Sequence, residues 1–310
     1  MNAVFVDPMV DDDRRRKFLF EGQLLVYSPR PSSLAFIEWA RELIREAFWP
    51  HDPLTAQHHL TVEKYIELLT LLKPKFINHP TSKQLLQNLL VDMGCNPDKT
   101  FFDVPRMRTS TSDNFLTSGI AYAFHPHRDT WYAAPMCQIN WWLPIYPIQP
   151  DNAMAFHSLY WDAPVANESR EFNYYEYVQT ARKDAAKYIK QDTRKQPHPI
   201  GQVELNPQIR VITKEGGMLL FSAAHLHSSV PNTSGYTRFS IDFRTVHIDD
   251  VAAKIGAPNV DAACTGTALR DFYRVSDLAK LPEELVVPHE NVQDICPTIQ
   301  QERGGGAVSL

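Results

Sequence analysis

The sequence predicts a mostly β fold, an antiparallel sandwich or barrel with helices packed against it. Before about residue 100, apolar residues recur at helical spacing; after it, short β-branched and aromatic runs alternate with Pro, Asn, Asp and Gly. Several short strands at such spacing are typical of antiparallel sandwiches and barrels. One helical stretch, about 168–190, interrupts the strands. This order favours a single domain over 1–310, with a mainly helical part (1–99), a β core (100–250) and a C-terminal extension (251–310).

Three helices are predicted in the first hundred residues. Ser32 and Ser33 can cap the first helix, which ends before Pro50. The second is expected to end at Pro74, because proline disrupts the helical hydrogen-bond ladder, and the third ends at Gly94. The three helices are expected over about 34–48, 60–73 and 81–93.

Seven short strands are predicted after residue 100, and a mostly irregular tail follows them. The strands are bounded by turn-forming residues and are rich in Val, Ile, Phe, Tyr and Trp. In the tail, a short helix is expected near 268–280. The predicted strands cover 101–109, 118–125, 134–146, 152–161, 208–214, 217–223 and 236–247.

Charge and hydropathy exclude several classes of protein. The chain of 310 residues has a net charge of −5 and a pI of about 6.2, so it lacks the basic field of a nucleic-acid-binding protein. Its basic run, residues 14–17, follows three aspartates and is interpreted as part of a mixed, solvated terminal segment. The sequence contains neither a signal peptide nor an apolar stretch of the roughly 20 residues that cross a membrane. We therefore expect a cytoplasmic protein with no nucleic-acid or membrane partner; its oligomeric state is left open.

The cysteines give no sign of a disulfide framework or a zinc site. The chain has four, and no two of them form a C-x-x-C pair. Free thiols in a reducing compartment are the simplest interpretation. The four are Cys95, Cys137, Cys264 and Cys296.

A histidine and an aspartate two residues apart, His127 and Asp129, are the first candidate metal ligands. They stand near a predicted strand end, where an imidazole and a carboxylate can reach one side of a metal ion. His125 lacks an acidic residue at the same spacing. An H-x-D pair alone is weak evidence in a chain with 12 histidines, so a third ligand must come from elsewhere.

The segment 216–240 supplies a candidate third ligand. A glycine turn leads into an apolar strand, then to His225 and His227, a polar turn and a strand that carries Arg238. On this last strand Arg238 and Ser240 share one face, where they form a clamp suited to a carboxylate. His227 is the preferred ligand, and His225 remains the alternative.

This segment resembles the distal-histidine region of the phytanoyl-CoA dioxygenase-like branch of the iron/2-oxoglutarate oxygenases. There, a strand ends in His and is followed by a small-residue turn, Pro-Asn-Thr-Ser and an Arg. In that register His227 matches the metal ligand, Arg238 matches the 2-oxoglutarate-binding arginine, and His127 and Asp129 match the H-x-D motif. The resemblance, which covers about residues 100–247, implies a double-stranded β-helix (jelly-roll or cupin-like) core with flanking N-terminal helices and one helical insertion.

Further site residues are expected near this motif. Gln138 and Asn140 share a face of a predicted strand and are candidates for binding the keto acid; a satisfied buried polar pair or a solvent-facing one is the alternative. Trp131, Arg128 and Trp142 are assigned to a substrate pocket. For Trp131, core packing is equally compatible with the sequence, and Arg128 should point away from the ligands.

The resemblance implies an enzyme that uses Fe(II), 2-oxoglutarate and O₂ to oxidise a small organic substrate, expected in specialised metabolism. It also implies hydroxylation, desaturation or oxidative cyclisation, because Asp129 occupies the position that a small residue takes in halogenating members. Two other functions stay open. One is a non-haem iron oxidase independent of 2-oxoglutarate, and the other is a cupin-like metal-binding module without redox chemistry.

Overall fold

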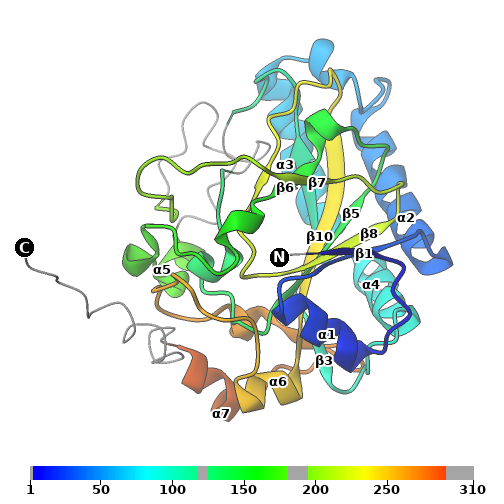
Figure 1. Ribbon diagram of the computed structural model, residues 1–310. Coiled ribbons are helices and arrows are strands. Elements are labelled where there is room, and N and C mark those ends of the chain that lie inside the picture. Colours follow the sequence, from blue (N-terminus) through cyan, green and yellow to red (C-terminus); the bar gives the residue numbers. More distant parts are fainter. Residues whose placement is uncertain (1–2, 118–124, 181–194, 291–310) are drawn as a thin grey trace, which may run out of the picture.

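The fold consists of two β sheets and a layer of helices (Figure 1). The computed structural model describes residues 3–117, 125–180 and 195–290. The larger sheet has the strand order β1-β2-β8-β5-β10-β3-β11 with β4 paired to β10, and the smaller sheet has the order β7-β6-β9. The strands are β1 (Val4–Val6), β2 (Leu24–Tyr27), β3 (Thr100–Phe102), β4 (Arg106–Ser110), β5 (Ile139–Pro144), β6 (Met154–Phe156), β7 (Ile209–Val211), β8 (Met218–Ser222), β9 (His227–Ser229), β10 (Arg238–His247) and β11 (Tyr273–Arg274).

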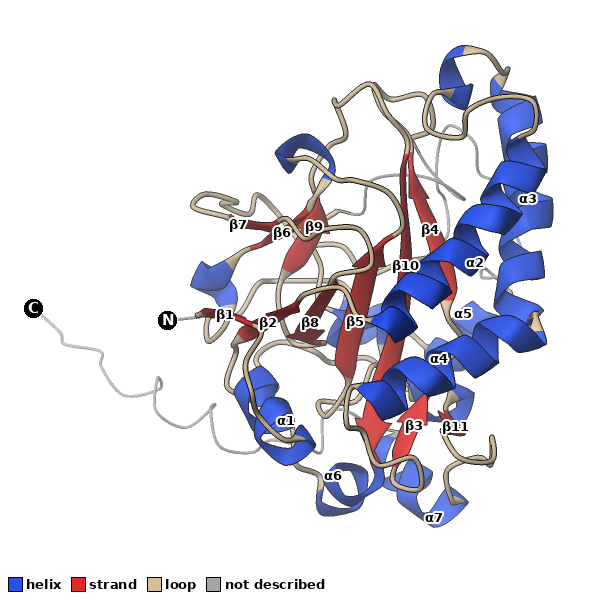
Figure 2. Ribbon diagram, turned by 90° about the vertical axis from the view of Figure 1, so that its right-hand side faces the viewer, coloured by secondary structure: helices blue, strands red, loops and turns tan. Residues whose placement is uncertain are grey.

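Helices cover one face of the larger sheet, and the smaller sheet lies on its other side. Figure 2 shows α2, α3 and α4 packed on the first face and β6, β7 and β9 on the opposite side. None of the described helices is long and apolar enough to cross a membrane. The helices are α1 (Asp12–Phe20), α2 (Pro31–Phe48), α3 (Val62–Asn78), α4 (Pro80–Asp92), α5 (Tyr174–Gln179), α6 (Ile248–Ala253) and α7 (Glu283–Val286).

The alternation of side chains along β10 separates the core from the site, as the sequence predicts. Phe239, Ile241 and Phe243 are 0% exposed and belong to the main hydrophobic core, to which the helices also contribute. Arg238 and Ser240 lie on the other face, because successive residues of a strand point to opposite sides. The inner face of the larger sheet is therefore polar along this strand.

Most predicted strands are confirmed, with shifted ends. The predicted run 101–109 is two strands, β3 and β4, separated at Pro105, and the strand predicted over 118–125 falls almost wholly outside the described residues. β1, β2 and β9 were not predicted. The helix predicted near 268–280 is wrong: a 3-10 turn, Ala268–Asp271, is followed by β11, which pairs with β3.

The predicted helix boundaries need three corrections. α2 begins at Pro31, and the Ser33 hydroxyl accepts a hydrogen bond from the backbone N–H of Arg30 at the N-cap position. α3 continues through Pro74, and its last turn is held by Phe76, which is buried and stacks on Phe36 with ring centroids 5.9 Å apart. Of the predicted helix 168–190, the described part contains the 3-10 turn Ser169–Glu171 and α5.

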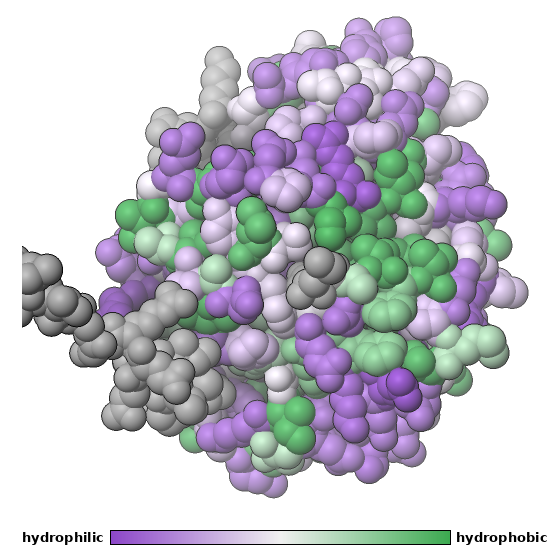
Figure 3. All heavy atoms as spheres, viewed as in Figure 1, coloured by the Kyte–Doolittle hydropathy of each residue, from purple (hydrophilic) through white to green (hydrophobic). Residues whose placement is uncertain are grey.

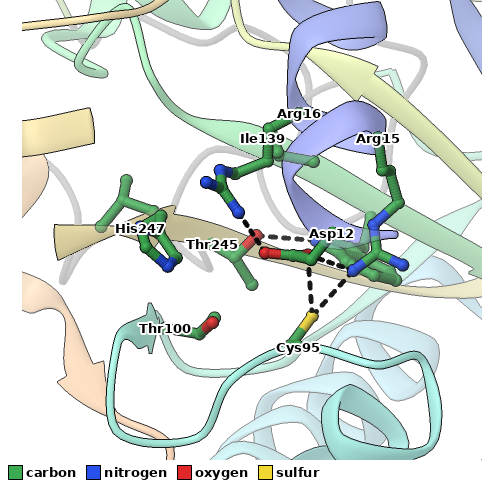
Figure 4. A pocket seen from close by; sticks show the side chains of 10 residues that line it. Asp12, Arg15, Arg16, Cys95, Thr100, Ile139, Thr245 and His247 are labelled. Atoms are coloured by element: carbon green, nitrogen blue, oxygen red, sulfur yellow. Dashed lines mark hydrogen bonds and ion pairs between the residues drawn. The ribbon is translucent and has the colours of Figure 1, made fainter. Parts of the chain in front are cut away.

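The charged segment near the N-terminus is also not a solvated one. It forms α1, in which Arg15 and Arg16 are buried and both pair with Asp12. These side chains line a small pocket together with Cys95 and His247 (Figure 4). Cys95, Cys137 and Cys264 are free and buried, as the absence of a disulfide pattern predicts, and Cys296 lies outside the described residues.

The first strand forms one edge of the larger sheet. β1 pairs only with β2 within the described part of the chain, in parallel register. Hydrophobic side chains gather on the surface near β1 and α2 (Figure 3), and Val4, Phe5 and Val6 are exposed. This edge is distant in strand order from β10.

Candidate metal centre

The structure brings His127, Asp129 and His227 together. One ligand atom of each lies within 4.8 Å of the others, and the two imidazole ring centroids are 4.4 Å apart. His127 precedes a 3-10 turn that starts at Asp129, and His227 is the first residue of β9. The two histidines form an isolated antiparallel bridge, so the backbone fixes the distance between segments far apart in sequence.

Both histidine rings are oriented by a backbone carbonyl two residues earlier. Nδ1 of His127 lies 2.8 Å from the carbonyl oxygen of His125, and Nδ1 of His227 lies 3.0 Å from that of His225. A carbonyl can only accept, so Nδ1 carries the proton in each ring and Nε2 keeps its lone pair. Each ring therefore presents Nε2 as a metal donor.

The alternative ligand His225 lies outside the group formed by His127, Asp129 and His227. Its Nε2 lies 3.1 Å from the carbonyl oxygen of Gly22, and its Nδ1 lies 3.3 Å from that of Ser222. It stands in a turn before β9, so it does not share the direction of His227, contrary to the expectation for a strand.

The ionisation of the group suits a cation. Burial lowers the pKa of His227 to about 3, and the neighbouring His127 acts in the same direction. Burial opposes the charged form of Asp129, but the adjacent imidazole of His127 and the charge of Arg244 outweigh it and hold its pKa well below the usual range. At neutral pH the group offers neutral His227 and a carboxylate as donors.

Side-chain amides hold one carboxylate oxygen of Asp129, Oδ2. Oδ1 lies 3.4 Å from Nε2 of His127, while Oδ2 accepts a hydrogen bond of 2.9 Å from Nδ2 of Asn140. Nε2 of Gln138 lies 3.4 Å from the same Oδ2 and donates to Oδ1 of Asn140 at 2.9 Å. Gln138 and Asn140 thus form the buried, satisfied pair that the sequence left open; their direct contact with a keto acid stays a prediction.

Arg244 lies beside the candidate metal group and was not predicted from the sequence. Its Nε lies 3.8 Å from Oδ2 of Asp129, and its guanidinium also reaches Asp103 at 3.2 Å and Asp242 at 3.3 Å. These carboxylates outweigh the effect of burial and raise the pKa of Arg244. The sequence signal for Arg244 was its place two residues after Asp242, which puts both residues on the inward face of β10.

Arg128 and Trp131 are buried and meet at one carboxylate, that of Asp261. Nε of Arg128 donates to Asp261 at 3.0 Å and Nε1 of Trp131 donates at 2.7 Å. Arg128 also donates to the carbonyl oxygen of Ala224 at 2.5 Å, which ties the segment before Asp129 to the loop before His227. Arg128 therefore stabilises the site's backbone; a substrate-pocket role for it or for Trp131 stays a prediction.

Arg238 lies on the inward face as a buried cation. It is 6% exposed, its Nη1 donates to the carbonyl oxygen of Asn152 at 2.9 Å, and its Cζ lies 5.7 Å from the ring centroid of Trp142. Burial, with the charge of Arg108, lowers its pKa to about 10, so it stays charged at neutral pH. Within the described ranges no carboxylate forms an ion pair with Arg238, and a buried unpaired charge is costly.

The carboxylate nearest to Arg238 along the strand face is already neutralised. Asp242 accepts hydrogen bonds from Nε and Nη2 of Arg108 at 2.6 and 3.2 Å. Burial opposes its charge, but Arg108 and Arg244 keep its pKa below the usual value. Asp242 therefore adds little net negative charge to this face.

The residues fit a divalent transition-metal ion. Two imidazole nitrogens and one carboxylate oxygen converge, and this donor set on one face of an octahedron is typical of non-haem Fe(II) sites with open positions. Both imidazoles and the carboxylate are oriented by further hydrogen bonds, as metal ligands usually are.

No protein-family model and no curated protein match this sequence. Among solved structures, similarity is found to a protein complexed with 2-oxoglutarate and to two non-haem, alpha-ketoglutarate-dependent enzymes. EvdO2 from Micromonospora carbonacea var. aurantiaca, complexed with 2-oxoglutarate, is 12% identical, with 77% of this chain and 92% of that chain covered and a TM-score of 0.41. The epimerase SnoN from nogalamycin biosynthesis is 13% identical, with 76% and 84% covered and a TM-score of 0.35. The carbocyclase SnoK from the same biosynthesis is 12% identical, with 77% and 85% covered and a TM-score of 0.36. TM-scores below 0.5 at such identities assign neither a fold nor an activity to this chain.

Proposed function

We propose that the protein is a non-haem Fe(II)/2-oxoglutarate-dependent oxygenase whose β core is a double-stranded β-helix within a single domain. The observation that carries the proposal is the convergence of His127, Asp129 and His227, with Nδ1 of both imidazoles bound to a backbone carbonyl so that Nε2 is the metal-donor atom. Such a group occupies one face of the metal and leaves room for a bidentate keto acid and O₂.

The iron, when bound, supplies the redox chemistry that couples decarboxylation of 2-oxoglutarate to succinate with oxidation of a substrate C–H bond by O₂. The residues of the chain orient the reactants. Asn140 and Gln138 donate hydrogen bonds to Oδ2 of Asp129, so Oδ1 stays directed toward the metal position.

Arg238 supports the choice of 2-oxoglutarate as co-substrate. It is a buried cation without a carboxylate partner among the residues described, and it lies on the same inward face as the residues that hold Asp129. A guanidinium binds a carboxylate through two hydrogen bonds, so the far carboxylate of 2-oxoglutarate would compensate the cost of its burial.

The proposed substrate is a small organic molecule of specialised metabolism. The proposed reactions are hydroxylation, desaturation and oxidative cyclisation, since Asp129 fills the ligand position that a halogenase leaves for halide. These three outcomes share the same first step on the substrate, the removal of a hydrogen atom.

Succinate release tests the proposal. Purified protein with Fe(II), ascorbate, 2-oxoglutarate and O₂ should form succinate slowly without added substrate, and His227→Ala should form none. Oxygen consumption on a substrate without succinate would instead support the 2-oxoglutarate-independent oxidase. Metal binding without oxygen consumption would support the non-redox module.

A further inference from the structure

Three buried polar atoms without a partner gather on the inward face of the larger sheet. They are Nε of Arg238, Oγ of Ser240 and Oγ of Ser110, and none has a hydrogen-bond partner within the described residues. Ser110 is 1% exposed and Ser240 is 0% exposed. Buried polar groups are nearly always hydrogen-bonded, so three such atoms together mark a surface suited to a polar ligand.

The sheet register places these three side chains next to one another. Ser110, at the end of β4, pairs directly with Arg238, and Ser240 pairs with Arg108 one step along the same two strands. Residues that oppose each other in an antiparallel pair project from the same face, with their Cβ atoms about 5 Å apart. Ser110 therefore belongs to the same surface as Arg238 and Ser240.

The chemistry of this group selects an anion. Nη1 of Arg238 is bound to the carbonyl oxygen of Asn152, which leaves the unpartnered Nε side of the guanidinium for a ligand. Two serine hydroxyls beside it can each donate one hydrogen bond. A guanidinium edge flanked by two hydroxyls is complementary to a carboxylate.

This group lies within reach of the metal ligands. Asn140 contacts Asp129 at 2.9 Å, and Trp142 lies two residues further along β5, roughly 7 Å away at the usual rise of a strand. The guanidinium carbon of Arg238 is 5.7 Å from the Trp142 ring centroid. A dicarboxylic keto acid chelated at the metal would extend past Trp142 toward Arg238.

We propose that Ser110 is a specificity residue that, with Arg238 and Ser240, binds the distal carboxylate of the keto-acid co-substrate. The inference rests on the proposed function and deepens it: the chain should discriminate 2-oxoglutarate from 2-oxo acids that lack a second carboxylate. Nothing in the local sequence around Ser110 signals this role, since the residue meets Arg238 only through the pairing of β4 with β10.

The test compares Ser110→Ala with Thr109→Val in the full-length protein. Thr109 is the matched control. Its hydroxyl is also buried and without a partner among the described residues, but Thr109 pairs with Phe239 and faces the helix side of the sheet, away from Arg238. Dissociation constants for 2-oxoglutarate and for 2-oxopentanoate, which has the same length and no distal carboxylate, are measured by anaerobic titration of the Fe(II)-loaded protein through its visible absorbance. Thermal melting of each variant is measured alongside.

Ser110→Ala should raise the dissociation constant for 2-oxoglutarate roughly tenfold or more, the loss expected for a hydrogen bond to a charged group. Its affinity for 2-oxopentanoate should stay within about twofold of wild type, its melting temperature should not fall, and Thr109→Val should bind both acids as wild type does. Equal affinity of Ser110→Ala and wild type for 2-oxoglutarate, or equal weakening for both acids, would overturn the inference while the proposed function stands. Absence of a 2-oxoglutarate-dependent band in wild type would overturn the proposed function, and the inference with it.

Discussion

His127 and His227 exchange two backbone hydrogen bonds of 3.0 Å, each residue donating its N–H to the carbonyl oxygen of the other. The two imidazoles of the candidate metal group are therefore positioned by a β bridge rather than by side-chain packing alone. Each ring is then set by the carbonyl of the residue two positions earlier, His125 or His225. A backbone carbonyl thus orients the ring on both sides of the site, whereas the orientation of Asp129 depends on side chains.

Asn140→Ala should weaken metal binding. Its Nδ2 donates to Oδ2 of Asp129 at 2.9 Å. Loss of a side chain that hydrogen-bonds a metal ligand typically costs about 10- to 100-fold in metal affinity. Competition of Fe(II) or Co(II) with a chromophoric chelator measures the change. Asn88→Ala, an exposed position on α4, is the matched control and should bind as wild type. Unchanged affinity in Asn140→Ala would contradict the role given to this amide.

Asp261→Asn should destabilise the fold. The change leaves the buried Arg128 guanidinium without its charged partner, and breaking a buried ion pair from one side costs about 3–5 kcal/mol. Urea unfolding of the metal-free protein at neutral pH measures the free energy of unfolding. Asp249→Asn breaks an exposed pair with Lys99 and should change it by about 1 kcal/mol or less. Equal effects of the two substitutions would show that Asp261 is not the anchor proposed for the Arg128 segment.

His157 should make stability dependent on pH. Burial lowers its pKa below the value of 6.5, and its Nε2 lies 2.9 Å from Oγ of Ser228. The folded state thus binds this proton less readily than the unfolded chain. The stabilisation is fully present above about pH 6.5, the ordinary histidine pKa, and is lost as the pH falls toward the lower folded-state value.

Urea unfolding of wild type and His157→Gln at pH 7.5, 6.5 and 5.5 checks this dependence. The loss of stability between the highest and lowest of these pH values should be smaller in the variant than in wild type. A variant that loses as much stability as wild type over this range would contradict the assignment.

Much of the site could be predicted because its signals are local. The H-x-D spacing of His127 and Asp129, and the alternation that puts Arg238 and Ser240 on one face of β10, are properties of short segments. The choice of His227 over His225 depended on the resemblance, since both were expected to face the same way. The structure separates them because His225 lies in a turn.

The residues that were missed act through contacts between distant segments. Asp261 reaches Arg128 from the C-terminal extension, and Ser110 stands opposite Arg238 only through the pairing of two strands. The same reason applies to the fold. The run of charged residues that forms α1 was expected to be exposed to solvent, but Arg16 is buried and forms an ion pair with Asp250. No local pattern indicates such pairings.

The measurement that tests the account most directly is anaerobic titration of the metal-free protein with Fe(II) and 2-oxoglutarate, followed by visible absorbance. Wild type and His225→Gln should both develop a weak metal-to-ligand band, because Nε2 of His225 lies against the Gly22 carbonyl and outside the metal group. His227→Ala should develop none. A band that persists in His227→Ala, or that is absent from wild type although iron binds, would contradict the proposed iron/2-oxoglutarate centre.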